Sequence, residues 1–394
     1  MSGRPTKASL RAAATALGIA LLATACGQAS RQAARPPAGN PAAKLSLATS
    51  VATTSRNWAV LVVGNSADST NDFWQLLTRP ARPTRPATGG TWRLVTPPGV
   101  ASNGGLVVAP TGTSSLLAGF LPSQELRFTP LATTASAGSS WSAGVLNARL
   151  ADTPDALAAD PGTAKVLALL ADGTLRQSLN SGQTWSTIAT RQSVARTQAG
   201  RRCDVTRLTG TAFSPSGDPM LTAGCTANGQ AGIFTLTSGT WQPGNPGVPA
   251  RQPVTTLSIS SSAGITQALL AIGDGATTGL AAARYAGDPA RWTLSQAFTV
   301  GNEKVLSVST GSNGTIAVLL SGRRGLLLAG AAADWRRLPG LPPATQALAA
   351  GPGTELQALT AGRTTVGVWT LNDSRSGWTQ AQHLPVPIQF GSSG

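Results

Sequence analysis

The chain has 394 residues, a formal net charge of +15 and only 11% charged residues, and it is rich in Gly (45) and Pro (27). Glu occurs three times and Lys four times, which excludes long helical bundles and coiled coils. Because 41% of the residues are hydrophobic, a disordered chain is excluded as well. The composition predicts a turn-rich, largely β body made of several small domains or of one large repeat fold.

The N-terminus has the pattern of an export signal, which we assign to residues 1–25. The cations Arg4, Lys7 and Arg11 precede a mostly apolar stretch over 12–25 that is too short to span a bilayer as a mature helix.

Residues 22–27 read LATACG, with small residues directly before a cysteine, and resemble the lipobox of bacterial lipoproteins. The resemblance implies that Cys26 receives diacylglycerol, becomes the mature N-terminus and anchors the chain in the lipid bilayer, at the outer face of the cell membrane. The alternative is an ordinary secretory signal cut near Ala25. Residues 26–43 consist mainly of Gln, Ala, Arg and Pro without apolar periodicity, and they predict a flexible tether.

The basic net charge reflects scarce acids more than abundant bases. A basic exterior would favour anionic lipid head groups or wall polymers, but a compositional bias towards Ala, Arg, Gly and Pro explains the charge at least as well. No cluster of Lys and Arg is interleaved with aromatic residues, so no nucleic-acid partner is expected.

Seven tryptophans recur along the chain, each after a polar turn and before a short strand-like run. They lie 43 to 56 residues apart, which is close to the roughly 40–50 residues of a four-stranded propeller blade. These residues are Trp92, Trp141, Trp185, Trp241, Trp292, Trp335 and Trp378.

The third of these units shows the strand pattern in full. Four runs rich in Val, Leu, Ile or Thr and bounded by Gly, Pro, Asp or Ser cover 155–160, 165–171, 174–180 and 184–190. The same pattern recurs in the other units, and the first unit is complete only if its first strand is taken from 44–52.

We therefore predict an all-β fold, a seven-bladed β-propeller of four-stranded blades over 44–388, followed by a tail over 389–394. Blades packed radially share one continuous core, although none could bury both of its sheet faces alone. A pair of β-sandwiches would also show regularly spaced strands, but it would not explain the recurring tryptophans.

Residues 178–185 read SLNSGQTW and resemble the BNR or Asp-box repeat, a Ser-x-Asp-x-Gly-x-Thr-Trp turn between the third and fourth strands of a blade. Residues 134–141, TASAGSSW, form a looser copy with Ser136 in the acidic position. In such a turn the Asx side chain accepts backbone N–H groups, Gly adopts a positive φ and the indole packs on neighbouring strands. The residues that we assign to this structural role are Ser178, Asn180, Gly182, Thr184, Trp185 and Trp141.

On these motifs the chain resembles the exported BNR- and YVTN-type propellers over 44–388, a superfamily that includes sialidases and many non-enzymatic lipoproteins. Sialidases of this fold use three arginines, a Tyr nucleophile assisted by Glu, and an Asp acid. Here the one tyrosine, Tyr285, lies in a third strand, no glutamate is near it in sequence, and the early Arg-Ile-Pro signature is missing. The one histidine, His383, lies in the last outer strand. We predict no catalytic residue, no metal site and no cofactor.

If Cys26 is acylated, Cys203 and Cys225 remain. The strand pattern puts Cys203 at the start of the first strand of the fourth unit and Cys225 at the end of the second. Antiparallel neighbours bring these positions together, so we predict a disulfide in an oxidising compartment, with two reduced buried cysteines as the alternative.

The longest connection between units, 190–202, carries four arginines. In a propeller this connection crosses the face with the channel mouth, where guanidinium groups could bind a carboxylate, a phosphate or an acidic protein patch. A solvated, mobile loop is the alternative. A second basic stretch with Arg79, Arg82 and Arg85 is assigned to a peripheral excursion. The four candidate binding residues are Arg191, Arg196, Arg201 and Arg202.

These features together predict a monomeric, lipid-anchored extracytoplasmic propeller that binds a protein or an anionic glycan without performing chemistry. The alternative is a divergent sialidase-like glycoside hydrolase. Three arginines, Tyr285 and a carboxylate clustered in the channel would favour the enzyme.

Overall fold

A computed structural model defines the fold of the second of two units into which the chain divides, Met1–Pro36 and Pro37–Gly394. The residues that it describes are 43–53, 55–65, 68–81, 91–100, 105–122, 126–147, 152–160, 163–262, 264–273, 278–287, 289–311, 314–328, 334–351, 355–361, 365–371 and 377–385. The predicted signal peptide, Cys26, the tether up to residue 42, Arg82, Arg85 and the predicted tail lie outside the described residues.

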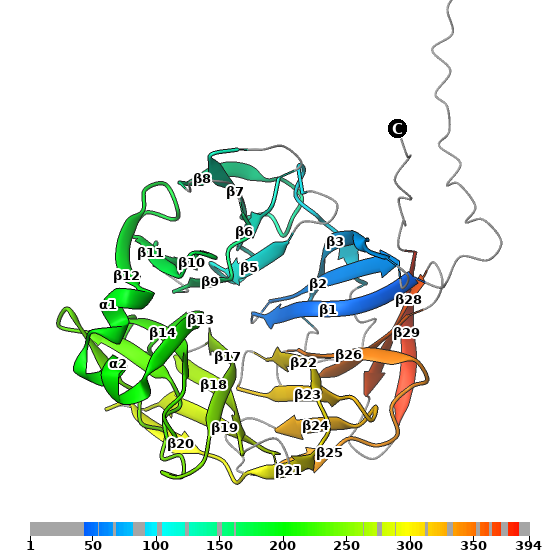
Figure 1. Ribbon diagram of the computed structural model, residues 1–394. Helices are drawn as coiled ribbons and strands as arrows, with labels where there is room; N and C mark the ends of the chain where they lie inside the picture. The colour runs from blue at the N-terminus through cyan, green and yellow to red at the C-terminus, as the bar shows by residue number, and fades with distance from the viewer. Residues whose placement is uncertain are drawn as a thin grey trace, which may run out of the picture. The chain divides into compact units, whose positions relative to one another are not determined.

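Strands dominate the described residues and follow one another along the chain in groups of four (Figure 1). The first three groups are β1 (Ala43–Ala52), β2 (Arg56–Asn65), β3 (Asp68–Pro80) and β4 (Arg93–Leu94); β5 (Leu106–Pro110), β6 (Leu116–Phe120), β7 (Phe128–Thr134) and β8 (Ser142–Asn147); and β9 (Ala156–Ala159), β10 (Val166–Leu169), β11 (Thr174–Ser178) and β12 (Ser186–Thr190). Two short helices, α1 (Arg191–Ala195) and α2 (Gln198–Cys203), then precede the next group.

The remaining strands continue this pattern with one extra strand, β21. They are β13 (Val205–Phe213), β14 (Pro219–Cys225), β15 (Ile233–Thr237) and β16 (Thr240–Pro243); β17 (Val254–Ser262), β18 (Ile265–Ile272), β19 (Thr278–Ala286), β20 (Arg291–Leu294) and β21 (Phe298–Gly301); β22 (Val305–Thr310), β23 (Ile316–Leu320), β24 (Gly325–Leu328) and β25 (Trp335–Arg337); and β26 (Thr345–Ala350), β27 (Leu356–Ala361), β28 (Thr365–Leu371) and β29 (Trp378–Pro385).

Each group forms antiparallel sheet in chain order, with β21 added against β19. The first group and the group β22–β25 form a continuous eight-stranded sheet, because their first strands are joined by one parallel pair, Val51 and Thr310. The described fold is thus all-β, as predicted, and its four-stranded sheets lie around a common centre in the manner of a β-propeller (Figure 1).

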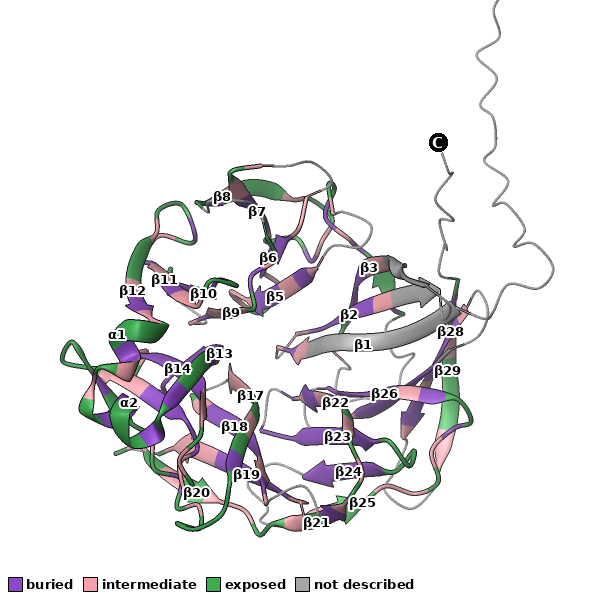
Figure 2. Cartoon of the chain, in the orientation of Figure 1, coloured by how far each residue is buried: buried purple, intermediate pink, exposed green. Residues whose placement is uncertain are grey.

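Second strands are the most deeply buried, as the apolar runs of the sequence predict (Figure 2). All the residues of β6, β10 and β23 are buried, because neighbouring sheets cover both faces of these strands. The runs are rich in Leu, Val and Ala, which fill the space between sheets without leaving polar groups to satisfy.

Among the described residues, seven clusters of buried apolar side chains lie between consecutive groups, including one between the last group and the first. Each cluster contains, or packs against, the tryptophan at the start of a fourth strand, and this indole contacts the preceding group. Trp241 of β16 joins the core of β10–β12, and Trp92, directly before β4, joins the core of β26–β29. The predicted position of the tryptophans is therefore confirmed, and the indoles hold successive sheets together.

The boundary between the first and last groups also contains a buried polar cluster. Arg79 Nη2 lies 2.5 Å from Glu355 Oε1, and the two side chains are 2% and 8% exposed. The guanidinium lies 5.4 Å from the ring centroid of Trp92, whose Nε1 donates to Gln357 Oε1 at 2.9 Å. Asn57, with its amide oxygen turned towards the guanidinium, accepts from Arg79 Nη2 at 2.7 Å.

The peripheral assignment of Arg79 was therefore wrong. The side chain is buried within β3, because a carboxylate and an amide replace the water that its charge would otherwise require.

Replacing Glu355 tests this cluster. A Glu355→Gln variant should lose about 3–5 kcal/mol of unfolding free energy, because it leaves the Arg79 charge buried without its counter-ion. Urea denaturation measures the loss. Arg324→Ala removes the half-exposed partner of Glu303 and should cost less than about 1 kcal/mol, which makes it the control. Native stability in the Glu355→Gln variant would contradict a structural role for the ion pair.

Candidate functional site: the central channel and its rim

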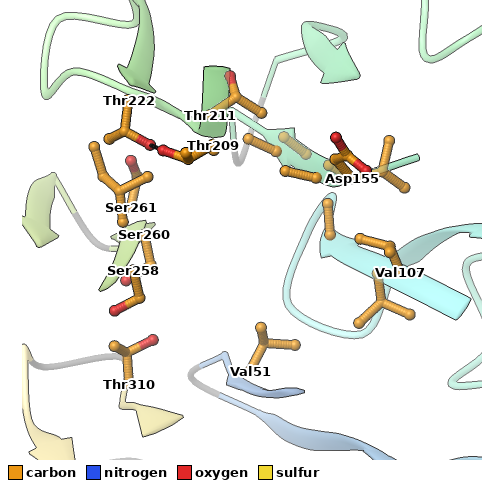
Figure 3. A pocket seen from close by; sticks show the side chains of 18 of the residues that line it. Val51, Val107, Asp155, Thr209, Thr211, Thr222, Ser258, Ser260, Ser261 and Thr310 are labelled. Atoms are coloured by element: carbon orange, nitrogen blue, oxygen red, sulfur yellow. Dashed lines mark hydrogen bonds between the residues drawn. The ribbon is translucent and has the colours of Figure 1, made fainter. Parts of the chain in front are cut away.

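A cavity of about 1210 Å³ follows the innermost strands of the sheets. It is lined by the first strands of six groups, β1, β5, β9, β13, β17 and β22, and by turns at both ends of these strands (Figure 3). β26 is not among the lining strands. On the channel side of β26, β1 and β22 pair with each other at Val51 and Thr310. We refer to this cavity as the channel.

The channel has two chemically different walls (Figure 3). We call the side formed by β1, β5 and β9 the apolar wall; its side chains include Val51, Val107, Ala156 and Ala158. We call the side formed by β13, β14, β17 and β22 the hydroxyl wall; its side chains include Thr209, Thr222, Ser258, Ser260 and Thr310, with Leu257 and Val308 of the same strands between them. Thr209 and Thr222 share a hydrogen bond of 2.9 Å between their hydroxyl oxygens.

Charged side chains gather at the end of the channel where the first strands begin. Because the strands of each group alternate in direction, this end also carries the turns between second and third strands and the connections from one group to the next. Asp155, Asp172, Arg191 and Arg207 line the channel here. We call this end the charged mouth.

The Asp155 carboxyl at this mouth has a raised pKa. Partial burial raises its pKa, the carboxylates of Asp152 and Asp172 also raise it, and the Arg207 guanidinium acts in the opposite direction. The Asp155 carboxyl therefore takes up its proton at a higher pH than an ordinary aspartate, so on acidification the charged mouth becomes more positive.

The connection between β12 and β13 is built as two short helices, where the sequence predicted a loop. Thr190 and Thr197 cap α1 and α2, and each hydroxyl accepts a backbone N–H of the first turn, at 3.1 and 2.9 Å. Val194 and Ala199 are buried in the core shared with β10–β14. These caps and contacts hold the connection against the sheets.

The predicted disulfide between Cys203 and Cys225 is present, with Cα atoms 4.9 Å apart. Cys203 ends α2 rather than opening a strand, because Asp204 adopts a left-handed conformation (φ 56°) that turns the chain from helix into β13. Val205, the first residue of β13, is paired with Cys225. The disulfide thus joins the end of the helical connection to the end of β14.

The four predicted arginines lie on this helical connection but do not all reach the channel. Arg191 lines the charged mouth, and its backbone N–H donates to Gly173 O at 3.1 Å. Arg196, Arg201 and Arg202 are exposed on the helices and do not line the channel, and Arg201 donates to the backbone oxygen of Arg196. These three form what we call the arginine rim.

Sequence reasoning missed Arg207 and Asp155 as lining residues. Both lie where a first strand begins, Arg207 in β13 and Asp155 directly before β9. The strand order alone contained a usable signal, since first strands line a propeller channel.

The turns at 134–141 and 178–185 share one hydrogen-bond pattern. Ser178 Oγ accepts the N–H of Gly182 at 2.8 Å, and Asn180 Oδ1 accepts the N–H of Thr184 at 2.9 Å. Gly182 has a φ of +87°, and Trp185 Nε1 donates to its carbonyl at 3.0 Å.

In the other turn, Thr134 Oγ1 accepts the N–H of Gly138 at 2.9 Å, and Ser136 Oγ accepts the N–H of Ser140 at 3.0 Å, next to Trp141. A serine hydroxyl thus replaces the Asx side chain as the acceptor. All of these bonds are internal to the turns.

Among the described residues, those that a sialidase reaction needs are not brought together. Tyr285 stacks on Trp292 with ring centroids 5.0 Å apart and does not line the channel. Glu303 and Glu355 pair with Arg324 and Arg79, and Glu125 lies outside the described residues.

His383 is exposed on β29, and its Nε2 lies 2.8 Å from the amide nitrogen of Gln380. Across the described part of the chain, no three His, Cys, Asp or Glu residues are grouped so that they could hold a metal ion. Within the same residues, no helix has the length and hydropathy needed to cross a membrane.

No protein-family model matches the chain, and no curated protein is similar to it in sequence. Among solved structures, it is similar to YCF48 bound to D1 peptide, with 12% identity, a TM-score of 0.48 and coverage of 86% of this chain and 98% of that one. It is also similar to the GH74 enzyme of Niastella koreensis, with 14% identity, a TM-score of 0.48 and coverage of 86% of this chain and 54% of that one.

A third similar structure is a protein from Lactobacillus plantarum, with 12% identity, a TM-score of 0.49 and coverage of 80% of this chain and 97% of that one.

Removing the disulfide should destabilise the fold and loosen the helical connection. A Cys203→Ala/Cys225→Ala variant should lose about 3 kcal/mol of unfolding free energy, because the bridge closes a loop with a sequence separation of 22 residues. Proteolysis at the arginines of α1 and α2 should accelerate, as shown by mass spectrometry of the first fragments. Reductant should reproduce both effects in the native chain and leave the variant unchanged. Equal protease resistance would show that the caps alone hold the connection.

Proposed function

We propose that this chain is a lipid-anchored, extracytoplasmic β-propeller that binds a protein or an anionic glycan and performs no chemistry on it. The binding surface would be the arginine rim together with the charged mouth of the channel.

The propeller would have seven blades. Each group of four strands is then one blade, with two blades inside the eight-stranded sheet, and each apolar cluster lies between neighbouring blades. The turns at 134–141 and 178–185 support placement among the exported BNR or Asp-box propellers, because their hydrogen bonds satisfy that turn pattern.

One observation carries the binding proposal. The caps, the buried side chains and the disulfide all fix the α1–α2 connection, yet Arg196, Arg201 and Arg202 on it are exposed. Binding to guanidinium groups on a fixed connection costs less loop-ordering entropy than binding to groups on a free loop would. They form fork-shaped contacts with carboxylate, sulfate or phosphate.

Anchoring at the outer face of the cell membrane is supported by the lipobox-like residues 22–27 and by the disulfide, since disulfides persist in oxidising compartments. One acyl-bearing cysteine and one bridge account for all three cysteines.

Replacing the arginine rim should weaken binding of an anionic partner. We expect the Arg196→Ala/Arg201→Ala/Arg202→Ala variant to bind poly-glutamate or heparin about tenfold less tightly, because each exposed charge pair contributes up to about 1 kcal/mol. Titration calorimetry at two salt concentrations measures this, and the salt dependence should fall with the affinity.

The matched control removes the same charge from exposed positions on the outer strands. Arg291→Ala/Arg336→Ala/Arg337→Ala should retain most of the affinity. Equal losses in the two triple variants would mean that net charge alone drives binding, and the arginine rim would lose its role.

Replacing Cys26 tests the anchor. A Cys26→Ser variant expressed in a bacterium that processes lipoproteins should leave the membrane fraction and lose incorporation of labelled palmitate, because serine offers no thiol for the diacylglycerol group. Cys203→Ala/Cys225→Ala is the control and should keep its label. A Cys26→Ser protein that stayed with the membrane unlabelled would favour another attachment.

A further inference from the structure

We propose that the channel itself binds an extended polypeptide segment whose side chains alternate between apolar and polar. This goes beyond the proposed function, because the residues concerned are those of the channel walls and not those of the arginine rim.

The size of the channel fits an extended chain. Lining residues of β17 run from Thr255 to Ser262, which at about 3.3 Å per residue is a depth of roughly 26 Å. An extended segment of about eight residues spans the same length at this rise per residue.

The channel also presents strand edges. β5, β9, β13 and β17 are each the terminal strand of their sheet, and each lines the channel. The outward N–H and C=O groups of such an edge strand are a template for pairing with another extended chain. The parallel pairing of β1 with β22 at Val51 and Thr310 is an instance of this pairing within the fold.

The two walls define the side-chain pattern of the ligand. Successive side chains of an extended chain point in opposite directions, so that one set would face the apolar wall and the other the hydroxyl wall. The hydroxyls of Ser258, Ser260 and Thr310 are partly exposed, and no hydrogen bond joins them to the described residues. They can therefore pair with polar side chains, while Val51 and Val107 face apolar ones.

The test uses three synthetic peptides with a fluorescent label on a C-terminal Gly-Lys extension. The first contains four Val-Thr repeats, the second has the same composition as a Val block followed by a Thr block, and the third repeats the first with N-methyl groups on alternate residues. Fluorescence anisotropy against the purified native protein should show saturable binding of the first peptide. The second and third should bind at least about tenfold more weakly.

Channel-filling variants locate the site. Ser260→Trp should weaken binding of the alternating peptide at least about tenfold, because the indole occupies the ligand volume. Val107→Trp fills the channel from the opposite wall. It is the test variant if Ser260→Trp does not fold. Leu179→Trp, at a residue 66% exposed outside the channel, is the matched control and should bind as the native chain does. Circular dichroism and the Tm show that each variant is folded.

Three results would overturn the proposal. They are equal binding of the alternating and block peptides, equal binding of the N-methylated peptide, and full binding by a folded Ser260→Trp variant. Binding of soluble heparin that is lost in Ser260→Trp, with no peptide binding, would assign the channel to a glycan instead. Because Ser260→Trp leaves the arginine rim intact, failure here is distinguishable from failure of the proposed function.

Discussion

The fold depends on one constraint, which is that each four-stranded sheet can bury its apolar faces only against its neighbours. The indole at the start of each fourth strand packs into the preceding group, so the same contact repeats around the centre. At the last boundary the chain has no covalent continuity, and among the described residues no strand from the N-terminal part of the chain joins the sheet β26–β29. There Trp92 packs on the last group and donates to Gln357, while Arg79 pairs with Glu355 across the boundary. Within the described residues, apolar packing, this ion pair and hydrogen bonds between the Gln382 amide and the Trp92 backbone thus hold the first and last groups together.

This arrangement also creates the channel and determines its chemistry. Sheets that converge on a centre leave the edges of their first strands facing one another, and their short side chains keep the space open. The longer charged side chains occur at one end, where connections and turns are exposed. The helical connection between β12 and β13 adds its arginines on that side, so Arg191 lies both on the connection and in the charged mouth.

Much of the fold could be predicted because its causes are local. The apolar second strands and the turn residues at 178–185 are each readable within about ten residues, and the tryptophans repeat at intervals of one four-stranded unit. Strand pairing in chain order joins only neighbouring runs. The site was harder to predict. Of the four candidate arginines only Arg191 lines the channel, and Asp155 and Arg207 were missed. Arg79 was misplaced because its partner Glu355 is distant along the chain.

By itself the sequence determined an all-β chain of repeated four-stranded units, the tryptophans that join them and the pairing of Cys203 with Cys225, since these follow from periodicity and short spacing. Tertiary structure alone decided that β1 pairs with β22 on the channel side of β26, that Arg79 is buried, and that an apolar wall faces a hydroxyl wall. These features arise between segments that are far apart in the chain. Their energies depend on which sheets become neighbours around the centre, and no local pattern contains that information.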